Sequence, residues 1–386
     1  MIIHSKPLTL LVSSYISLFV GFYLWTTLNY QIGQVDDSRY LYTALFVLSF
    51  LFFFPSVIQI NPVKPLIVFV FYCCFLMIIH GDLLHATLYI MWLIYALIIL
   101  PKLFSLNFEI FQTYINVIFY GTLVLLFLLF LYALFSEVNV YFEAGGRRLR
   151  YTSGLSNPSI YAKLVATSLW LSFLLFILSK RAIYLIYMIG LFLLLILADM
   201  RTDLFGAIIG ISAFLVLNSK RKFTYISIIM LVAVSALVWI MLNFSIYDVD
   251  KILSGRIYLW LNLYNESGFG ESAKVFLVGS GDYSEHYDSQ WLEILLKFGL
   301  IGFAIFLYAF IYLFVKLGRA RKNETNVLYK GIFTWGQALW IAFGAQGVTL
   351  YIFPSLGNTY NLILIPIIVA ASFLAEKRRK IVSTVQ

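Results

Sequence analysis

The chain is short of charged residues. Only 12% of its 386 residues are Asp, Glu, Lys or Arg, whereas 62% are hydrophobic, and a soluble domain carries roughly 25% charged residues. Such a composition excludes a soluble protein, because too few polar groups are available to cover a surface in water. The apolar residues form long continuous runs, which indicates membrane-spanning helices. The sequence therefore predicts an all-α polytopic membrane protein.

Cysteine and histidine are also scarce. The two cysteines, Cys73 and Cys74, are adjacent within an apolar run, a pattern that fits neither a disulfide framework nor a metal site. The four histidines are scattered and form no H-E-x-x-H pattern. We therefore expect no cofactor and no metal, and a site that handles phosphate would use arginines.

About twelve apolar runs come close to the roughly 20 residues that a bilayer requires. The first run has no small-residue cleavage site, so it is interpreted as a span rather than a signal peptide. The predicted spans are 8–28, 41–60, 65–80, 83–100, 112–136, 158–179, 182–198, 204–218, 224–243, 291–315, 331–351 and 359–375.

The basic residues predict the orientation of these spans. One set of loops holds 17 of the 27 Lys and Arg residues but only three of the 18 acidic residues. Loops rich in Lys and Arg stay in the cytoplasm, so both termini are expected there. The net charge of +9 is thus explained by topology, and we expect contact with membrane lipids but no nucleic-acid partner.

The outward side carries three polar segments within what we interpret as one membrane domain, residues 1–386. They are the loop 137–158, the short turn 198–203 and the long loop 244–290, which is expected to carry short helices. A polar, charge-rich stretch in a membrane protein is the default place for chemistry.

Arg201 lies in the turn between two predicted spans. Arginine offers a fixed fork of donors that matches phosphate and stays charged at any pH, so Arg201 could clamp an anion. The alternative is a local ion pair with Asp199 or Asp203, or a side chain that reaches to the interface.

Within the long loop, Ser254 can cap a short amphipathic helix that contains Arg256 and Trp260. These two residues are four apart and so share a face. They could bind a substrate together. Alternatively, the helix only lies on the membrane with Trp260 as an interfacial anchor.

His286 and Asp288 come just before the span that begins at 291. Either could accept a proton near neutral pH, the carboxylate if burial raises its pKa. The alternative is that Asp288 or Ser289 only caps the helix. Glu293 and Lys297 form an i,i+4 pair in the favourable order, which we interpret as structural.

Four further basic residues, Arg147, Arg148, Arg150 and Lys163, lie outside or in the outer part of the span at 158–179. A basic vestibule of this kind suits a pyrophosphate or an acidic sugar. Attraction to anionic lipid headgroups is the alternative.

Taken in order, these elements resemble the O-antigen polymerase and O-antigen ligase family (Wzy-type) over residues 147–303. The resemblance is carried by the turn with Arg201, by Arg256 with the following Trp260, and by the His286/Asp288 stretch. It continues into a span that ends in Gly299-x-x-Gly302. The ligases usually have His followed by Asn where this chain has Asp288-Ser289, and Asp at this place is more similar to the polymerases.

The resemblance implies a GT-C-like enzyme in the bacterial inner membrane, with its active site on the periplasmic face. It would move a glycan from undecaprenyl pyrophosphate to a sugar hydroxyl. Arg201 and Arg256 would stabilise the departing pyrophosphate, and Asp288 or His286 would take the acceptor proton. The basic vestibule and Trp260 would hold the second pyrophosphate or the sugar chain.

The function predicted from this resemblance is an O-antigen polymerase, which adds the growing glycan to the next undecaprenyl-pyrophosphate-linked repeat unit. A chain-length regulator is the partner that the family implies. The nearest alternative is a ligase that transfers the glycan to the lipid A core. A lipid-linked oligosaccharide flippase is a further alternative, but it should place its charges deep within the spans, and a structural scaffold would leave the arginines unexplained.

Overall fold

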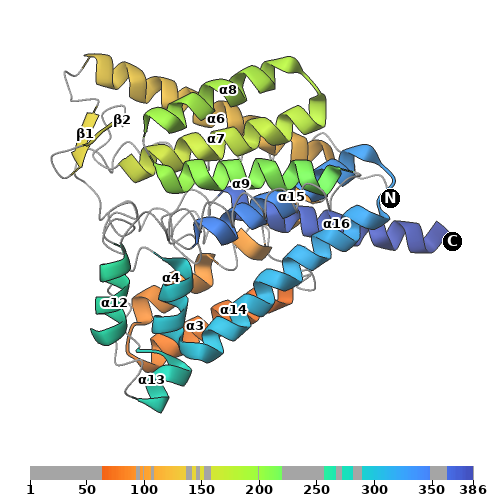
Figure 1. Ribbon diagram of the computed structural model, residues 1–386. Helices are drawn as coiled ribbons and strands as arrows, with labels where there is room; N and C mark the ends of the chain where they lie inside the picture. The colour runs from red at the N-terminus through yellow and green to blue at the C-terminus, as the bar shows by residue number, and fades with distance from the viewer. Residues whose placement is uncertain are drawn as a thin grey trace, which may run out of the picture.

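The computed structural model describes residues 63–92, 96–98, 100–105, 108–135, 141–144, 148–151, 158–198, 200–219, 256–266, 272–280, 289–347 and 363–385. Figure 1 shows that the described chain is mainly helical. The spans predicted at 8–28, 41–60 and 224–243 lie outside the described residues.

The long helices follow most of the predicted spans in the described residues, to within several residues at their ends. The helices are α3 (Lys64–Ile79), α4 (Leu83–Trp92), α5 (Leu100–Phe104), α6 (Phe108–Phe135), α7 (Pro158–Ser179), α8 (Ala182–Leu197), α9 (Arg201–Asn218), α12 (Arg256–Glu266), α13 (Ala273–Val278), α14 (Gln290–Asn323), α15 (Val327–Gln346) and α16 (Ile365–Val385). The strands are β1 (Tyr141–Ala144) and β2 (Arg148–Tyr151). The span predicted at 83–100 is divided between α4 and α5.

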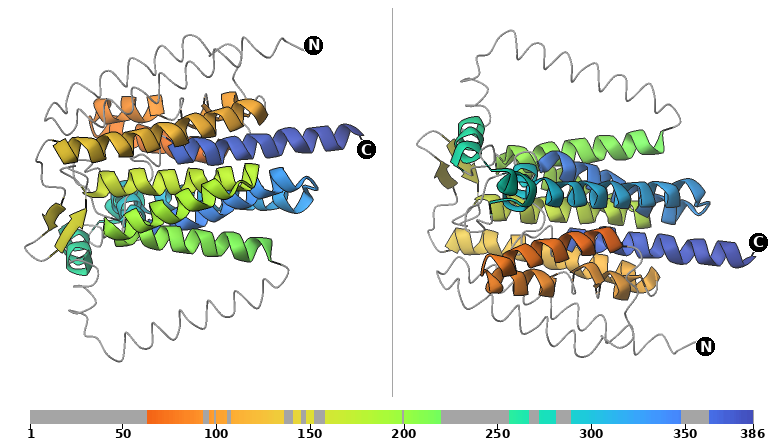
Figure 2. Two further views of the ribbon diagram at one scale, coloured as in Figure 1. Left: turned by 90° about the horizontal axis from the view of Figure 1, so that it is seen from above. Right: turned by 90° about the horizontal axis from the view of Figure 1, so that it is seen from below.

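The long helices run side by side as a bundle (Figure 2). By length and composition, α6, α7 from Tyr161 on, α9 and α14 can each cross a membrane, and α3 and α8 are shorter apolar helices. The chain is therefore an all-α polytopic membrane protein, and the number of twelve spans stays a prediction.

The bundle buries one group of apolar side chains and leaves another on its surface. Helix α7 is at the centre, where Trp170 is buried and its backbone carbonyl accepts a hydrogen bond from the Trp335 indole N–H at 3.1 Å. Helix α8 instead exposes Ile186 and Leu193. An exposed apolar surface of this kind is stable in lipid, where it displaces no water.

One end of the bundle gathers the predicted outward segments. Helix α6 ends there at Phe135, while α7, α9 and α14 begin there at Pro158, Arg201 and Gln290. The strands and the helices α12 and α13 lie at the same end (Figures 1 and 2). We call it the loop end of the bundle.

The sequence predicts only a polar loop over 137–158, but the structure contains an antiparallel hairpin there. Strand β1 pairs with β2 so that Phe142 lies opposite Arg150, and Ala144 lies opposite Arg148. The pattern was missed because strands of four residues are too short to show a clear alternation. Two of the predicted vestibule arginines thus belong to a paired strand.

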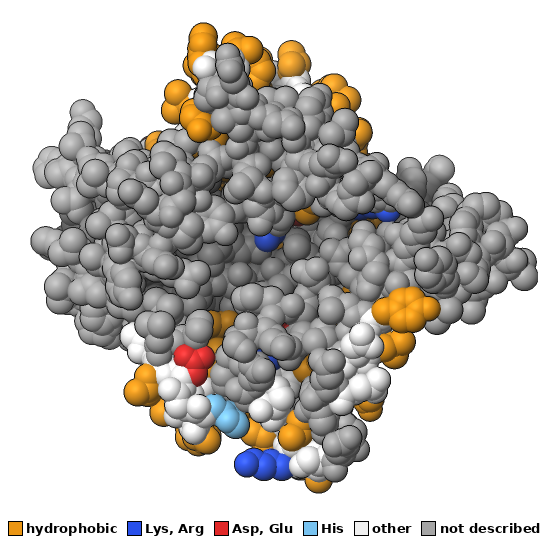
Figure 3. Space-filling view, turned by 90° about the vertical axis from the view of Figure 1, so that its left-hand side faces the viewer, with side chains coloured by type: hydrophobic (Ala, Val, Ile, Leu, Met, Phe, Trp, Pro, Cys, Tyr) orange, Lys and Arg blue, Asp and Glu red, His pale blue; other side chains and the backbone are white. Residues whose placement is uncertain are grey.

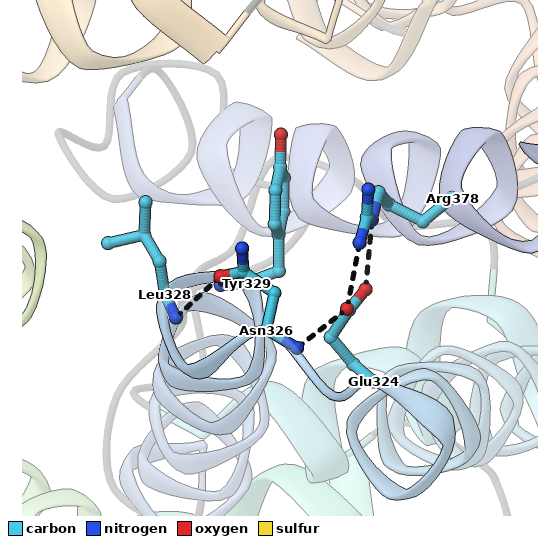
Figure 4. Close-up of polar contacts among 5 residues, drawn as sticks. All are labelled: Glu324, Asn326, Leu328, Tyr329 and Arg378. Atoms are coloured by element: carbon cyan, nitrogen blue, oxygen red, sulfur yellow. Dashed lines mark hydrogen bonds and ion pairs between the residues drawn. The ribbon is translucent and has the colours of Figure 1, made fainter.

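The opposite end is held by an ion pair between α16 and the α14–α15 turn (Figure 4). Arg378 donates two hydrogen bonds to the Glu324 carboxylate, at 3.1 and 3.0 Å. The guanidinium also lies over the Tyr329 ring at 4.8 Å from its centre. Asn326 caps α15 by accepting from the Leu328 N–H at 2.9 Å. Two parallel hydrogen bonds and a stacked ring make this a strong contact.

Arg378→Ala is expected to destabilise the protein by about 1–3 kcal/mol at pH 7. The two hydrogen bonds from Arg378 lower the pKa of Glu324 below its ordinary value. A carboxyl of this kind stabilises the fold fully above its unfolded pKa of about 4.3, and the contribution is lost as the pH falls through the lower folded pKa. The difference in thermal midpoint between wild type and variant should therefore be larger at pH 7 than at acidic pH.

The exposed Arg319 of α14 provides the control variant Arg319→Ala, whose thermal midpoint should change little. A difference that is the same at every pH would contradict the prediction.

Candidate functional site

Arg201 is the first residue of α9, rather than part of a turn that continues to 203 as predicted. The helix begins earlier, so Arg201 is exposed while Asp203, in the same helical turn, is completely buried. A cation is disfavoured by the positive end of the helix dipole, whereas an anion bound there would be stabilised by the backbone N–H groups and by arginine together. The placement of Arg201 therefore favours an anion at this helix start.

Asp203 connects α9 to the end of α15. Its carboxylate Oδ1 accepts a hydrogen bond from Gln346 Nε2 at 3.3 Å. Both side chains are buried. Two ion-pair partners were considered for Arg201. A contact with Asp203 stays open, and Asp199 lies outside the described residues.

The start of α14 follows directly on Asp288. Ser289 is the N-cap, and its hydroxyl accepts a hydrogen bond from the Leu292 N–H at 3.4 Å. This confirms a cap at Ser289, one of the two residues considered. His286 and Asp288 lie outside the described residues, so their role as proton acceptor stays a prediction.

The predicted pair of Glu293 and Lys297 is confirmed and is deeply buried. Lys297 Nζ lies 2.7 Å from Glu293 Oε1, and the two side chains are 5% and 1% exposed, respectively. A buried ion pair is costly to desolvate and is held only where geometry is favourable. The i,i+4 spacing predicts the pairing, whereas its burial in the first part of α14 depends on neighbouring helices.

Gly299 breaks α14 just after this pair. Its φ of +66° and ψ of −173° are not helical, a conformation that favours glycine. A Cβ here would lie 2.4 Å from the backbone of Leu277 in α13. The Leu296 carbonyl accepts from the Ser280 N–H at 2.8 Å, and the Phe298 carbonyl accepts from the Tyr72 hydroxyl at 3.2 Å. The glycine therefore lets the long loop pack directly against the α14 backbone.

Arg256 is the first residue of α12, as predicted from the cap signal at Ser254, which itself lies outside the described residues. Trp260 is half-buried, while Tyr258 and Leu261 are exposed. The short helix thus exposes two large apolar side chains at the loop end, and both interpretations of Trp260, ligand contact and interfacial anchor, stay open.

The predicted basic vestibule is only partly described. Arg148 and Arg150 lie in β2, and Lys163 is half-buried near the start of α7. Arg147 lies outside the described residues. Figure 3 looks onto the left-hand side of Figure 1, which is the loop end, and shows some Lys or Arg side chains near its middle.

Residues 183–307 match the family model described as O-antigen ligase. Over this stretch, the chain is similar to the O-antigen ligase family. No curated protein matches the chain. The matched O-antigen ligase family domain runs from α8 into α14 and contains Arg201, Arg256, Trp260, His286 and Asp288. The vestibule arginines and Lys163 precede it, although the predicted resemblance began at residue 147.

Members of the O-antigen ligase family are membrane enzymes that resemble glycosyltransferases. In this domain both candidate arginines, Arg201 and Arg256, stand at the first position of a helix. Helix starts are ready sites for phosphate. Among the described residues there is no group of three His, Cys, Asp or Glu side chains that could hold a metal. The prediction of a site without metal stays a prediction.

Two residues of this region were missed as candidates. Asp203 was considered only as a partner for Arg201, and Gln346 was not considered, although a buried amide within a predicted span is a signal of function or of helix contact. Their burial and contact became visible only when α9 and α15 were brought together.

Proposed function

We propose that this protein is an O-antigen polymerase, a multi-pass membrane glycosyltransferase of the bacterial inner membrane. It moves the growing glycan from undecaprenyl pyrophosphate onto the next lipid-linked repeat unit at the periplasmic face. The observation that supports it most is that Arg201 and Arg256, both within the O-antigen ligase family domain, each begin a helix.

The chemistry needs charge stabilisation and a proton acceptor. As the bond between the sugar and the pyrophosphate breaks, negative charge grows on the departing undecaprenyl pyrophosphate. Arg201 and Arg256, together with the N–H groups at the two helix starts, would stabilise it. Asp288 or His286 would take the proton from the attacking hydroxyl. The electron pair of the broken sugar–pyrophosphate bond thus leaves with the lipid pyrophosphate. The attacking hydroxyl oxygen bonds to the sugar, and its proton stays on the base.

The other basic residues suit the acceptor. Arg147, Arg148, Arg150 and Lys163 would hold its pyrophosphate or the sugar chain, while the exposed apolar helices would lie in lipid beside the polyprenyl tails. A chain-length regulator is the expected protein partner. The termini would be cytoplasmic, as the basic loops predict.

A ligase is the second candidate, because the matched family model carries that description. The polymerase is favoured because Asp288-Ser289 stands where ligases have His followed by Asn.

A gel of lipopolysaccharide from a strain without this gene tests the proposal. We expect core capped by a single repeat unit in the deletion strain, and a full ladder after complementation. Core without any repeat unit, with lipid-linked polymer accumulating, would identify a ligase instead. An unchanged ladder would contradict both.

A further inference from the structure

Three helix ends meet at the loop end through the last turn of α15. Gln346 donates from Nε2 to Asp203 Oδ1 of α9 at 3.3 Å. The carbonyl of the next residue, Gly347, accepts from the Gln290 N–H of α14 at 2.8 Å and from the Ser289 hydroxyl at 3.4 Å. One short segment at the end of α15 therefore contacts both the first helical turn of α9, which contains Arg201, and the start of α14.

The contact is closely packed as well as hydrogen-bonded. A Cβ on Gly206 would lie 2.3 Å from the Gln346 side chain, so the glutamine fills a notch in α9 that only glycine leaves open. A Cβ on Gly347 would lie 2.9 Å from Nε1 of Trp291, and this indole N–H donates to the Gly344 carbonyl at 2.9 Å. Small residues at helix contacts permit such close approach in membranes.

We propose that Gln346 and Asp203 are positioning residues, which fix the α9 turn bearing Arg201 relative to the start of α14. The inference rests on the proposed function. If Arg201 stabilises the leaving pyrophosphate and the proton-accepting residue lies just before α14, the distance between these two residues must be held constant. A shift of about 1 Å can cost 10²-fold in rate. Helix α15 lies outside the matched family domain, so its role was not implied by that match.

The chain offers a matched control on the same helix. Gln337 of α15 is also buried, donates from Nε2 to the Phe314 carbonyl at 3.0 Å, and fills the notch at Gly318 of α14. A Cβ on Gly318 would lie 2.6 Å from Gln337 Nε2. This pair repeats the geometry of Gly206 and Gln346 but contacts the later half of α14, away from Arg201.

The test uses purified full-length protein in nanodiscs, with lipid-linked repeat units extracted from the deletion strain as donor. Gln346→Ala should lower kcat by roughly 10- to 100-fold while the KM for the donor changes little, because the lost alignment acts in the transition state. Gln337→Ala should lower the thermal midpoint but leave kcat within about twofold of wild type.

A double variant separates alignment from packing. In Gly206→Ala/Gln346→Ala the new methyl group fills part of the emptied notch, so the thermal midpoint should recover in part. The methyl cannot donate to Asp203, so kcat should stay low. Gly318→Ala/Gln337→Ala is its control and should keep normal kcat. This comparison holds even if Gln346→Ala alone folds poorly.

The outcomes are distinct. The positioning role is overturned if the Gly206→Ala/Gln346→Ala variant has the kcat of wild type, or if the Gln346 and Gln337 variants lose kcat equally. In either case, turnover of the donor by the wild-type protein still upholds the proposed function. Wild-type protein that does not consume the donor would overturn the proposed function, and the positioning role with it.

Discussion

Arg201→Ala is expected to reduce glycan transfer by about 10²–10³-fold, the usual cost of one lost preorganised donor at a developing negative charge. Arg201 is exposed at the first position of α9, so its removal leaves the core of the bundle unchanged. The lipopolysaccharide ladder of the complemented deletion strain should collapse to single repeat units. The amount of variant protein in the membrane should equal that of wild type.

The control is another exposed arginine at the opposite end. Arg181 precedes α8, and Arg181→Ala should leave the ladder intact. Arg201→Lys keeps the charge but loses the fork of donors, so it should fall between the two. Arg256→Ala should resemble Arg201→Ala. A normal ladder with both alanine variants would contradict the role of Arg201 and Arg256 in stabilising the leaving pyrophosphate.

Lys297→Met is expected to destabilise the protein by about 3–5 kcal/mol, because it leaves the buried Glu293 carboxylate without the ammonium group at 2.7 Å. Replacing both partners in Glu293→Leu/Lys297→Met removes the uncompensated charge, so the double variant should be much closer to wild type. Retention of folded protein after heating, followed by fluorescence-detected gel filtration in detergent, measures the difference.

A second lysine on α14 provides the matched control. Lys316 lies 3.2 Å from Glu376, but both side chains of this pair are partly exposed. Lys316→Met should therefore cost only about 0–1 kcal/mol. A double variant at 293 and 297 that is as unstable as Lys297→Met would show that the charges themselves are required. Equal losses for Lys297→Met and Lys316→Met would contradict the role given to burial.

The α14 segment illustrates what could be predicted from local sequence. The N-cap at Ser289, the i,i+4 spacing of Glu293 and Lys297, and the helix start near 290 all depend on neighbours within one or two turns. Each is confirmed in the structure. Gly299 was named only as part of the family resemblance, and the break there was not predicted, since the residues that contact it belong to α13, a helix that precedes it by about twenty residues.

The Asp203–Gln346 contact shows why the rest could not be predicted. The two residues are 143 positions apart, and helices that are apolar all round give no period that marks the face toward a neighbour. In lipid, the core face and the outer face are about equally hydrophobic. Hydropathy therefore locates a span but does not show which residues meet.

By itself, the sequence determined that this is an all-α polytopic membrane protein, where most of the described spans lie, and that a short helix contains Arg256. These features depend on composition and on contacts within a few residues. Only the tertiary structure decided that Asp203 and Lys297 are buried, that β1 pairs with β2, and that α15 connects the Arg201 turn to α14. Those features depend on which helix faces meet, and that is fixed by packing between segments distant in the chain.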